Sequence, residues 1–171
     1  MQKVNRCLKE WNSTVEALGH GKQTFLIRSY DTALEGFFLY PTGSYSIRKG
    51  YLDAFKEDYY NFVEENSLPR KKGKQTEIKY YADVVKIIKK PNLSINRLLK
   101  YHIWTNEHVR DYLKNSQGYI WLLRVHKLKR PFYADESKAI RYVKLKRGVS
   151  TDGMIPVIND DDFNKVYSKI N

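Results

Sequence analysis

The chain has 171 residues, about the size of one domain, and 42% of them are hydrophobic. Its 31 Lys and Arg outnumber its 19 Asp and Glu and give a formal net charge of +12. This composition excludes disorder over most of the length, and the charge favours a polyanionic partner such as nucleic acid. No apolar run reaches the ~20 residues of a membrane span and the N-terminus has no secretion signal. We therefore expect a soluble cytoplasmic protein without a membrane partner.

The first third of the chain predicts a helix and two strands. Leu8, Trp11, Val15 and Leu18 follow helical spacing, which predicts a helix over about residues 5–18 with the single Cys7 as a small buried hydrophobe. Residues 24–28 and 37–40 are rich in aromatic and branched side chains and predict two strands paired with each other, the second stopped by Pro41. The intervening loop carries Asp31 and Glu35.

The middle of the chain predicts a second helix, a basic loop and a long strand. Apolar residues recur at helical spacing over residues 51–63, and the stretch of about 66–76 that follows is short of apolar groups, so we expect an exposed, mobile loop. Residues 77–88 predict a strand that ends before Pro91. Two short helices should then begin at the N-cap residues Ser94 and Thr105.

The last third predicts two strands and a terminal helix. Residues 118–128 and 140–146 have strand patterns, and three aspartates after Asn159 are typical of the first turn of a helix, over about 160–170. No repeat or shift in composition marks a boundary. The order of elements predicts a single α+β domain over residues 1–171, with a mixed, barrel-like sheet and flanking helices.

The positive charge is concentrated in two blocks. Residues 66–100 carry 10 basic and 2 acidic side chains, residues 110–147 carry 11 and 3, and residues 1–65 are close to neutral with 8 and 9. Charge that only kept the protein in solution would not be segregated in this way. We therefore expect one basic face built from the two blocks.

Metal and nucleophilic chemistry have little support in the sequence. The four histidines form no H-x-x-x-H pair, and a single cysteine excludes an internal disulfide and a cysteine-based zinc cluster, so we expect no metal and no small-molecule cofactor. One enzymatic alternative stays open. Glu77-Ile78-Lys79 matches half of a nuclease site in which two carboxylates hold Mg²⁺ or Mn²⁺ and a lysine stabilises charge. Glu35, Asp31, Asp53 and Asp58 are the candidates for the second acid.

Cations and aromatic side chains are interleaved in the basic blocks, as expected where phosphates bind cations and unpaired bases stack on rings. We expect a nucleic-acid-binding protein, with a nuclease or a protein-interaction module as alternatives. The candidate nucleic-acid-binding residues are Lys22, Arg28, Tyr40, Thr42, Arg70, Lys71, Lys72, Lys74, His102, Trp104, Arg124, His126, Arg141 and Lys144. Trp104, Arg124 and His126 together in an open concave pocket would indicate base recognition, whereas three buried side chains would reduce the claim to an electrostatic one. The pattern favours neither RNA nor DNA and leaves the oligomeric state open.

Several short stretches carry a family resemblance when they are taken in order along the chain: Leu8–Trp11, Val15–Leu18, Phe38–Thr42, His102–Thr105, Leu122–Val125, Pro156–Val157 and Asp162–Phe163. In order and spacing they resemble the family catalogued as domain of unknown function 1802, over nearly the whole chain. The His-Ile-Trp-Thr stretch is the most specific of them. That family implies an architecture but no established activity.

A second resemblance concerns the first and last strands. Trp11, Gly21-Lys22 and Arg28 before and in the first strand, and Tyr119–Lys127 with Leu128 and Pro131 in a late one, look like the small β-barrels of the PUA-like superfamily, which includes ASCH and EVE barrels. Such barrels typically bind RNA or modified bases. This resemblance implies that Lys22, Arg28, Tyr40 and Thr42 line a cleft with Trp104 and Arg124.

Overall fold

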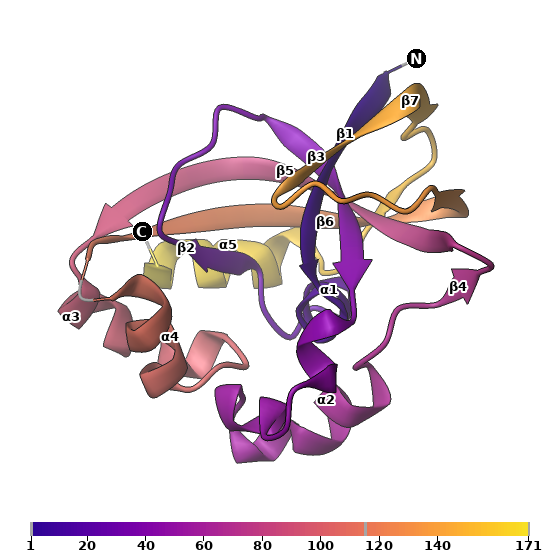
Figure 1. The fold of residues 1–171 in the computed structure, drawn as a ribbon. Helices are drawn as coiled ribbons and strands as arrows, with labels where there is room; N and C mark the ends of the chain where they lie inside the picture. Colours follow the sequence, from indigo (N-terminus) through magenta and orange to yellow (C-terminus); the bar gives the residue numbers. More distant parts are fainter. Residues whose placement is uncertain (1, 115, 171) are drawn as a thin grey trace.

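The computed structural model describes residues 2–114 and 116–170, which form one curved, mixed sheet with helices around it (Figure 1). The eight strands are β1 (Lys3–Trp11), β2 (Phe25–Arg28), β3 (Gly36–Thr42), β4 (Lys71–Lys72), β5 (Gln75–Lys90), β6 (Gly118–Ala134), β7 (Tyr142–Ser150) and β8 (Ile155–Pro156). Within this described part, no helix combines the length and the apolar composition that a membrane span requires.

The helices are short. They are α1 (Asn12–Gly19), α2 (Tyr60–Glu65), α3 (Asn92–Ile95), α4 (Asn106–Leu113) and α5 (Asp160–Ile170), with 3₁₀ turns at Ser44–Ile47, Tyr51–Ala54, Glu57–Tyr59 and Asn96–Tyr101. Two of the expected caps are present. The side-chain oxygen of Thr105 accepts a hydrogen bond from the His108 N–H (3.1 Å), and that of Asn159 accepts one from the Asp162 N–H (2.8 Å). Ser94 is not an N-cap, because it lies inside α3.

The sheet has the order β2-β6-β5-β3-β1-β7, with β4 added to β5 and β8 added to β6. Strands β1 and β3 are parallel and the other pairs are antiparallel. Two register shifts between β5 and β6 let these long strands bend, since an unpaired residue increases local twist. The end strands β2 and β7 do not pair, so the barrel is not closed. The expected α+β, barrel-like fold with flanking helices is confirmed.

The first helix was predicted wrongly, because residues 3–11 form strand β1 and only α1 is helical. Tertiary pairing overrides the helical spacing: β1 is hydrogen-bonded to β3 on one side and to β7 on the other. Cys7 is buried as expected, but on a strand, and burial raises the pKa of its thiol to about 12. The thiol is therefore a packing group.

The predicted hairpin is also wrong. β2 pairs with β6, and β3 pairs with β1 and β5, so the two strands are not neighbours. Pro41 does not end β3, which continues to Thr42. β5 follows β3 only as far as Phe38, so a residue without an N–H at position 41 interrupts no ladder on that side.

Three other elements differ from the prediction. The expected helix over residues 51–63 is broken into 3₁₀ turns and α2, because Phe55 is extended and forms a bridge with Trp104. The expected basic loop is a hairpin, in which β4 pairs with the start of β5. The strand predicted at 118–128 extends to Ala134, and the one predicted at 140–146 is β7, starting at Tyr142.

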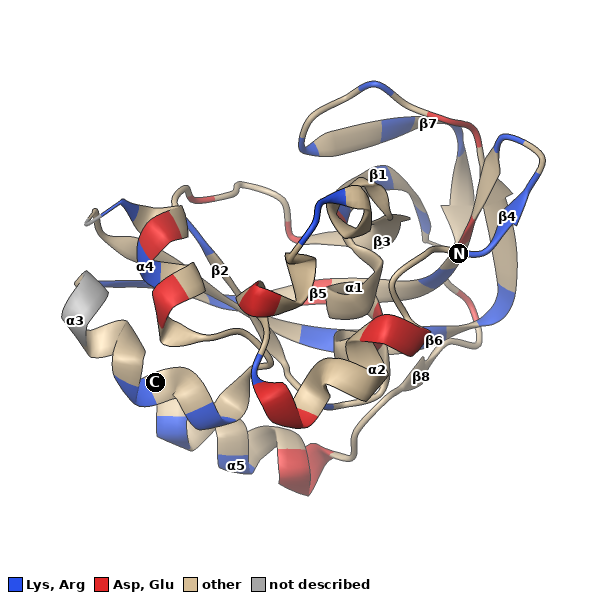
Figure 2. Ribbon diagram, turned by 60° about the horizontal axis from the view of Figure 1, so that its bottom comes forward, with Lys and Arg blue, Asp and Glu red and all other residues tan. Residues whose placement is uncertain are grey.

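Two hydrophobic clusters fill the fold. The larger packs α1, α4, α5 and the 3₁₀ turns against β1, β2, β3, β5 and β6, and includes Phe25, Phe37 and Trp121. The smaller lies among β1, β3, β5, β6 and β7 and includes Cys7, Phe38 and Ile78. Figure 2 shows positions of Lys and Arg on the β4–β5 hairpin, β6 and β7, and positions of Asp and Glu on α2 and at the start of α5.

Candidate nucleic-acid interface

An open pocket of about 400 Å³ lies beside the ends of β1, β2 and β3. α4 forms another wall, and so does the segment Asp135–Arg141 between β6 and β7, which we call the strap. We name the cavity the Trp11 pocket. It is lined by Lys9, Glu10, Trp11, Ile27, Arg28, Tyr30, Thr42, Ser44, Trp104, His108, Val109, Tyr112, Ala139 and Ile140. Its volume falls within the range of ligand pockets, roughly 300–1,000 Å³.

Strand register places the first residues of this pocket. The parallel pairing of β1 with β3 sets Glu10 opposite Pro41 and Trp11 opposite Thr42. The Thr42 hydroxyl donates a hydrogen bond to the Glu10 carbonyl oxygen (3.3 Å), which ties the two strand ends together. Arg28 ends β2, far from β1 in strand order, and the curvature of the sheet brings it back to Glu10.

The floor of the pocket holds a compensated pair of charges. The Arg28 guanidinium pairs with the Glu10 carboxylate, and the two side chains are only 11% and 8% exposed. Arg28 also donates to the Ile27 carbonyl oxygen (2.9 Å), and the other Glu10 oxygen accepts from the Trp11 N–H (2.9 Å). These bonds fix both side chains. The floor therefore offers polar groups with little net charge.

Aromatic rings form the lower wall. The Trp11 indole stacks on the Tyr45 ring, with centroids 4.7 Å apart and planes within 12°. Its centroid lies 5.4 Å from that of the His108 imidazole. Burial lowers the pKa of His108, with a smaller opposing effect of Asp111, so the imidazole is neutral at pH 7 and offers both a donor and an acceptor. Trp104 is buried behind this wall.

Two cations hold the rim. The Lys9 ammonium donates to the Ser137 carbonyl oxygen of the strap (2.5 Å), and burial lowers the pKa of Lys9 against a smaller effect of Glu136. The Arg141 guanidinium lies over the Tyr30 ring, 3.6 Å from its centre. Arg141 is exposed, so its charge faces solvent at the mouth of the pocket.

The structure brings some of the predicted site residues together. Arg28, Thr42 and Trp104 line the pocket, and Arg141 lies at its rim. Lys22 and Tyr40 do not line it, contrary to what the PUA-like resemblance implied. The Lys22 ammonium lies over the Phe62 ring (4.9 Å), and Tyr40 belongs to the smaller core cluster, where its hydroxyl donates to the Asp135 carbonyl oxygen (2.8 Å).

Arg124 and His126 are not in the pocket with Trp104, and all three side chains are largely buried. These three residues together therefore give no support to base recognition. The Arg124 guanidinium donates to the Ile158 carbonyl oxygen and to an Asp160 carboxylate oxygen, both at 2.9 Å, and stacks on Phe163 at 4.8 Å. Arg124 therefore holds α5 against the sheet. His126 is half-buried beside Asp83, and burial lowers its pKa, against smaller effects of Asp83.

His102 is enclosed and does not reach a ligand surface. It is 1% exposed, and its Nδ1 accepts a hydrogen bond from the Trp104 N–H (3.1 Å). Burial, with a smaller effect of Lys56, lowers the pKa of His102 to about 3. The imidazole is therefore neutral and orients the backbone next to Trp104.

The remaining predicted cations are exposed. Arg70, Lys71, Lys72 and Lys74 lie on the β4–β5 hairpin, and Lys144 lies on β7. Figure 2 shows these segments at the end of the molecule away from α3 and α4. They are available to phosphates, at a distance from the Trp11 pocket.

The residues of the nuclease hypothesis are only partly gathered. Glu77 and Lys79 line a smaller pocket of about 180 Å³ with Glu16, while Glu35, Asp31, Asp53 and Asp58 lie elsewhere. The Glu16 oxygens are occupied, one by the Lys79 ammonium (2.5 Å) and one by the Tyr80 hydroxyl (3.0 Å). A divalent cation would have to displace that lysine, so this donor set fits the ion poorly. Residues 2–114 and 116–170 contain no group of three or more His, Cys, Asp and Glu that could hold a metal.

Glu10, Trp11 and His108 line the pocket but were not among the residues predicted from the sequence. The helix predicted over 5–18 put Trp11 in the core, whereas it is half-buried at the end of a strand. No local signal marks the start of α1, because the helix begins directly after Trp11 and no side chain of the described residues caps it.

Comparison with solved structures identifies the fold. The ASCH protein from Zymomonas mobilis shares 13% identity and superposes with a TM-score of 0.52, covering 95% of this chain and 93% of that one. A tyrosine-to-phenylalanine variant of the same protein shares 12% identity with a TM-score of 0.51, covering 95% of this chain and 96% of that one. A serine-to-alanine variant shares 13% identity with a TM-score of 0.51, covering 96% of this chain and 94% of that one. These values show that the chain has an ASCH-like fold, as expected.

Comparison with protein families and with curated proteins gives one match. No curated protein matches the sequence. The model of one family matches residues 7–169, which is nearly the whole chain and includes every residue that lines the Trp11 pocket. The chain belongs to the family described as Domain of unknown function (DUF1802).

Proposed function

We propose that this protein binds single-stranded RNA, with one unpaired base in the Trp11 pocket and the phosphates against exposed cations. The observation that carries the proposal is the stacked Trp11 indole beside a floor of paired charges. An aromatic platform of this kind contributes ~1–3 kcal/mol per stacked base in proteins that bind single strands. The ASCH-like fold is consistent with RNA binding.

The electrostatics of the pocket favour a base over a phosphate. Glu10 already neutralises Arg28 at the floor, so a phosphate there would find no free positive charge. A base is neutral, and its edge carries donors and acceptors that match Thr42, His108 and the paired side chains. Arg141 at the rim is positioned for the phosphate next to that base.

Phosphate binding follows from the distribution of charge. The chain has a net charge of +12, and four of its cations lie exposed within five residues of the β4–β5 hairpin: Arg70, Lys71, Lys72 and Lys74. Such cations release counterions when they bind a nucleic acid backbone, which makes the affinity dependent on salt. They contribute to affinity and not to the choice of base.

The test is a titration of labelled 12-nucleotide single strands of RNA and of DNA at several salt concentrations. If several phosphates are engaged, the affinity should fall by about 10³-fold or more between 50 and 200 mM salt. A flat response, or no binding at 50 mM salt, contradicts the proposal.

The same samples separate binding from cleavage. They are incubated with Mg²⁺ or Mn²⁺, and the strands are then measured by gel electrophoresis. Intact strands support a binding protein. Metal-dependent cleavage that is lost in Glu77→Ala would support the nuclease alternative instead.

A further inference from the structure

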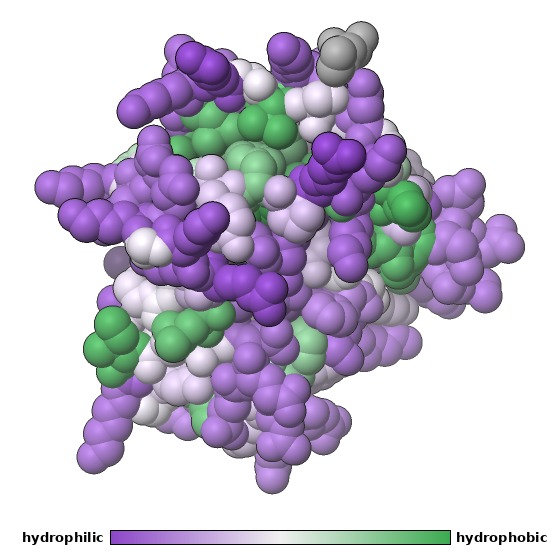
Figure 3. Space-filling model, turned by 90° about the vertical axis from the view of Figure 1, so that its right-hand side faces the viewer, coloured by the Kyte–Doolittle hydropathy of each residue, from purple (hydrophilic) through white to green (hydrophobic). Residues whose placement is uncertain are grey.

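A second concave surface lies on the other side of the strap. It has a volume of about 420 Å³ and is formed where the end of β6 meets β7, with an apolar floor of Phe132, Val143, Leu145 and Val149. We call it the β7 groove. Figure 3 faces this end of the molecule and shows apolar surface bordered by hydrophilic side chains.

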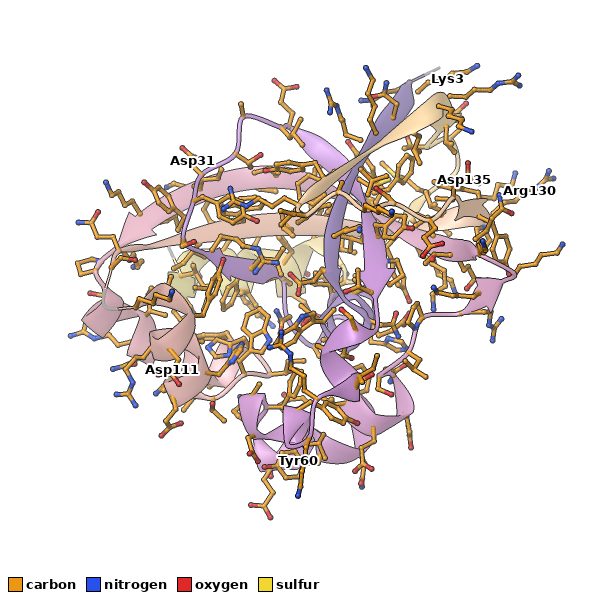
Figure 4. All side chains as sticks on the ribbon, viewed as in Figure 1. Lys3, Asp31, Tyr60, Asp111, Arg130 and Asp135 are labelled. Atoms are coloured by element: carbon orange, nitrogen blue, oxygen red, sulfur yellow. The ribbon has the colours of Figure 1, made fainter. Side chains whose placement is uncertain are left out.

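Three cations of β7 line the groove, and the acidic side chains that line it are Asp135 and Glu136 of the strap. Lys144 and Arg147 line it and form no ion pair within the described residues, while Lys146 makes a single, exposed pair with Asp135 (3.6 Å). Arg6 on β1 lies directly opposite Lys144 in the β1–β7 ladder. Figure 4 places Lys3 and Arg130 at the same end of the molecule. Like charges opposite each other destabilise a sheet, and an anionic ligand would offset that cost.

The strap is a wall of both concavities. Asp135 and Ser137 line the β7 groove, whereas Ala139 and Ile140 line the Trp11 pocket. Three peptide steps separate Ser137 from Ile140, so the two sites are within roughly 10 Å of each other along the chain. Lys9 and Tyr40 hold the strap through the carbonyl oxygens of Ser137 (2.5 Å) and Asp135 (2.8 Å). The separation is therefore fixed.

We infer that one RNA strand crosses the strap and occupies both sites, which makes the ligand an oligonucleotide and not a single nucleotide. This inference rests on the proposed function. One base stacks on Trp11, the strand passes over the exposed strap residues, and a neighbouring base covers the apolar floor of the β7 groove. Lys144 and Arg147 bind the phosphates of that second part. Cations next to an apolar floor match a strand that has charge along its backbone and flat bases beside it.

The test is a series of oligouridylates of one to eight nucleotides, measured by competition against a labelled 12-mer at 50 mM salt. For the wild type, affinity should rise at least about tenfold between two and five nucleotides and then level off, since linking two sites raises the affinity over either one. The variant K144A/R147A should keep the affinity for dinucleotides and lose most of that rise. Both positions are exposed, so the fold should be retained.

A matched control removes the same charge elsewhere. The variant K165A/K169A loses two exposed cations of α5, outside both concavities, and should keep the length dependence. If K144A/R147A and the control behave alike, or if the wild type gains nothing beyond two nucleotides, the two-site inference is wrong while the proposed function stands. If no oligonucleotide binds at any length, both are wrong.

Discussion

The guanidinium of Arg28, at the end of β2, is paired with the carboxylate of Glu10 on β1, at the floor of the Trp11 pocket. β2 and β1 are four places apart in the order of the sheet, so this pair joins strands that no backbone hydrogen bond connects. The same two side chains hold the curvature of the sheet and set the charge of the pocket.

Removing one partner of this pair should destabilise the fold. Arg28→Ala leaves the Glu10 carboxylate buried without compensation, which costs about 3–5 kcal/mol of unfolding free energy for such pairs. Arg141→Ala, at the exposed rim of the same pocket, should cost about 1 kcal/mol or less. Urea unfolding of both variants gives the comparison. Equal losses would mean that the buried pair does not support the sheet.

Base pairing should weaken binding. A base can enter the Trp11 pocket only when it is unpaired, so annealing the 12-nucleotide strand to its complement should lower the affinity at least about fivefold, the lower end of the contribution of one stacked base. The duplex carries twice the phosphates, and a purely electrostatic binder would prefer it. Competition between the two forms at one salt concentration separates these mechanisms.

Acid should destabilise the protein through His102. The pKa of this imidazole is about 3 in the fold, below its ordinary value of 6.5, so the unfolded chain takes up a proton as the pH falls below 6.5 while the folded chain does not. Stability is therefore present above pH 6.5 and declines below it, by about 2 kcal/mol between pH 7 and pH 5 for this one group.

The variant His102→Asn tests this account of the pH dependence. Its loss of stability between pH 7 and pH 5 should be smaller than that of the wild type by about the same 2 kcal/mol. Phe25→Leu, which alters the ring packed on His102 (6.0 Å between centroids) but keeps the imidazole, should retain the wild-type dependence. Identical curves for His102→Asn and the wild type would show that His102 does not resist protonation.

Arg124 should affect the terminal helix and not the binding of RNA. Arg124→Met removes two hydrogen bonds and a cation–π contact to the segment that starts α5, and a loss of about 1–3 kcal/mol is expected for hydrogen bonds of a charged group. Hydrogen exchange of residues 160–170 should become faster, while affinity for the single strand stays within about twofold of the wild type, well below the effect of one stacked base. A large loss of affinity would show that Arg124 contributes to RNA binding.

Elements with strong local signals were predictable from the sequence. The acidic first turn after Asn159 located α5 at Asp160–Ile170, and the aromatic and branched run from Gly118 located β6. The barrel-like α+β class followed from the order of such elements. The N-terminal strand was not predictable in this way, because its apolar residues fit helical spacing and its pairing partners lie about 30 and 140 residues away.

The same non-local effect limited the prediction of the site. Arg28, Thr42 and Trp104 came from the family resemblance and line the pocket. Arg124 and His126 are residue types that bind nucleic acid, but both lie on β6, where Arg124 bonds the segment before α5 and His126 lies beside Asp83 of β5. Residue type and block charge predict a basic, aromatic surface, whereas strand register decides which side chains share a cavity.

The central claim is that Trp11 provides the platform for an unpaired base. The most direct test is the affinity of Trp11→Ala for the 12-nucleotide single-stranded RNA, measured by anisotropy at 50 and 200 mM salt, with Tyr59→Ala as an aromatic control outside the pocket. We expect Trp11→Ala to bind at least about fivefold more weakly at both concentrations with an unchanged salt dependence, since stacking and phosphate contacts are separate contributions. Wild-type affinity in Trp11→Ala, with the variant folded, would contradict the account.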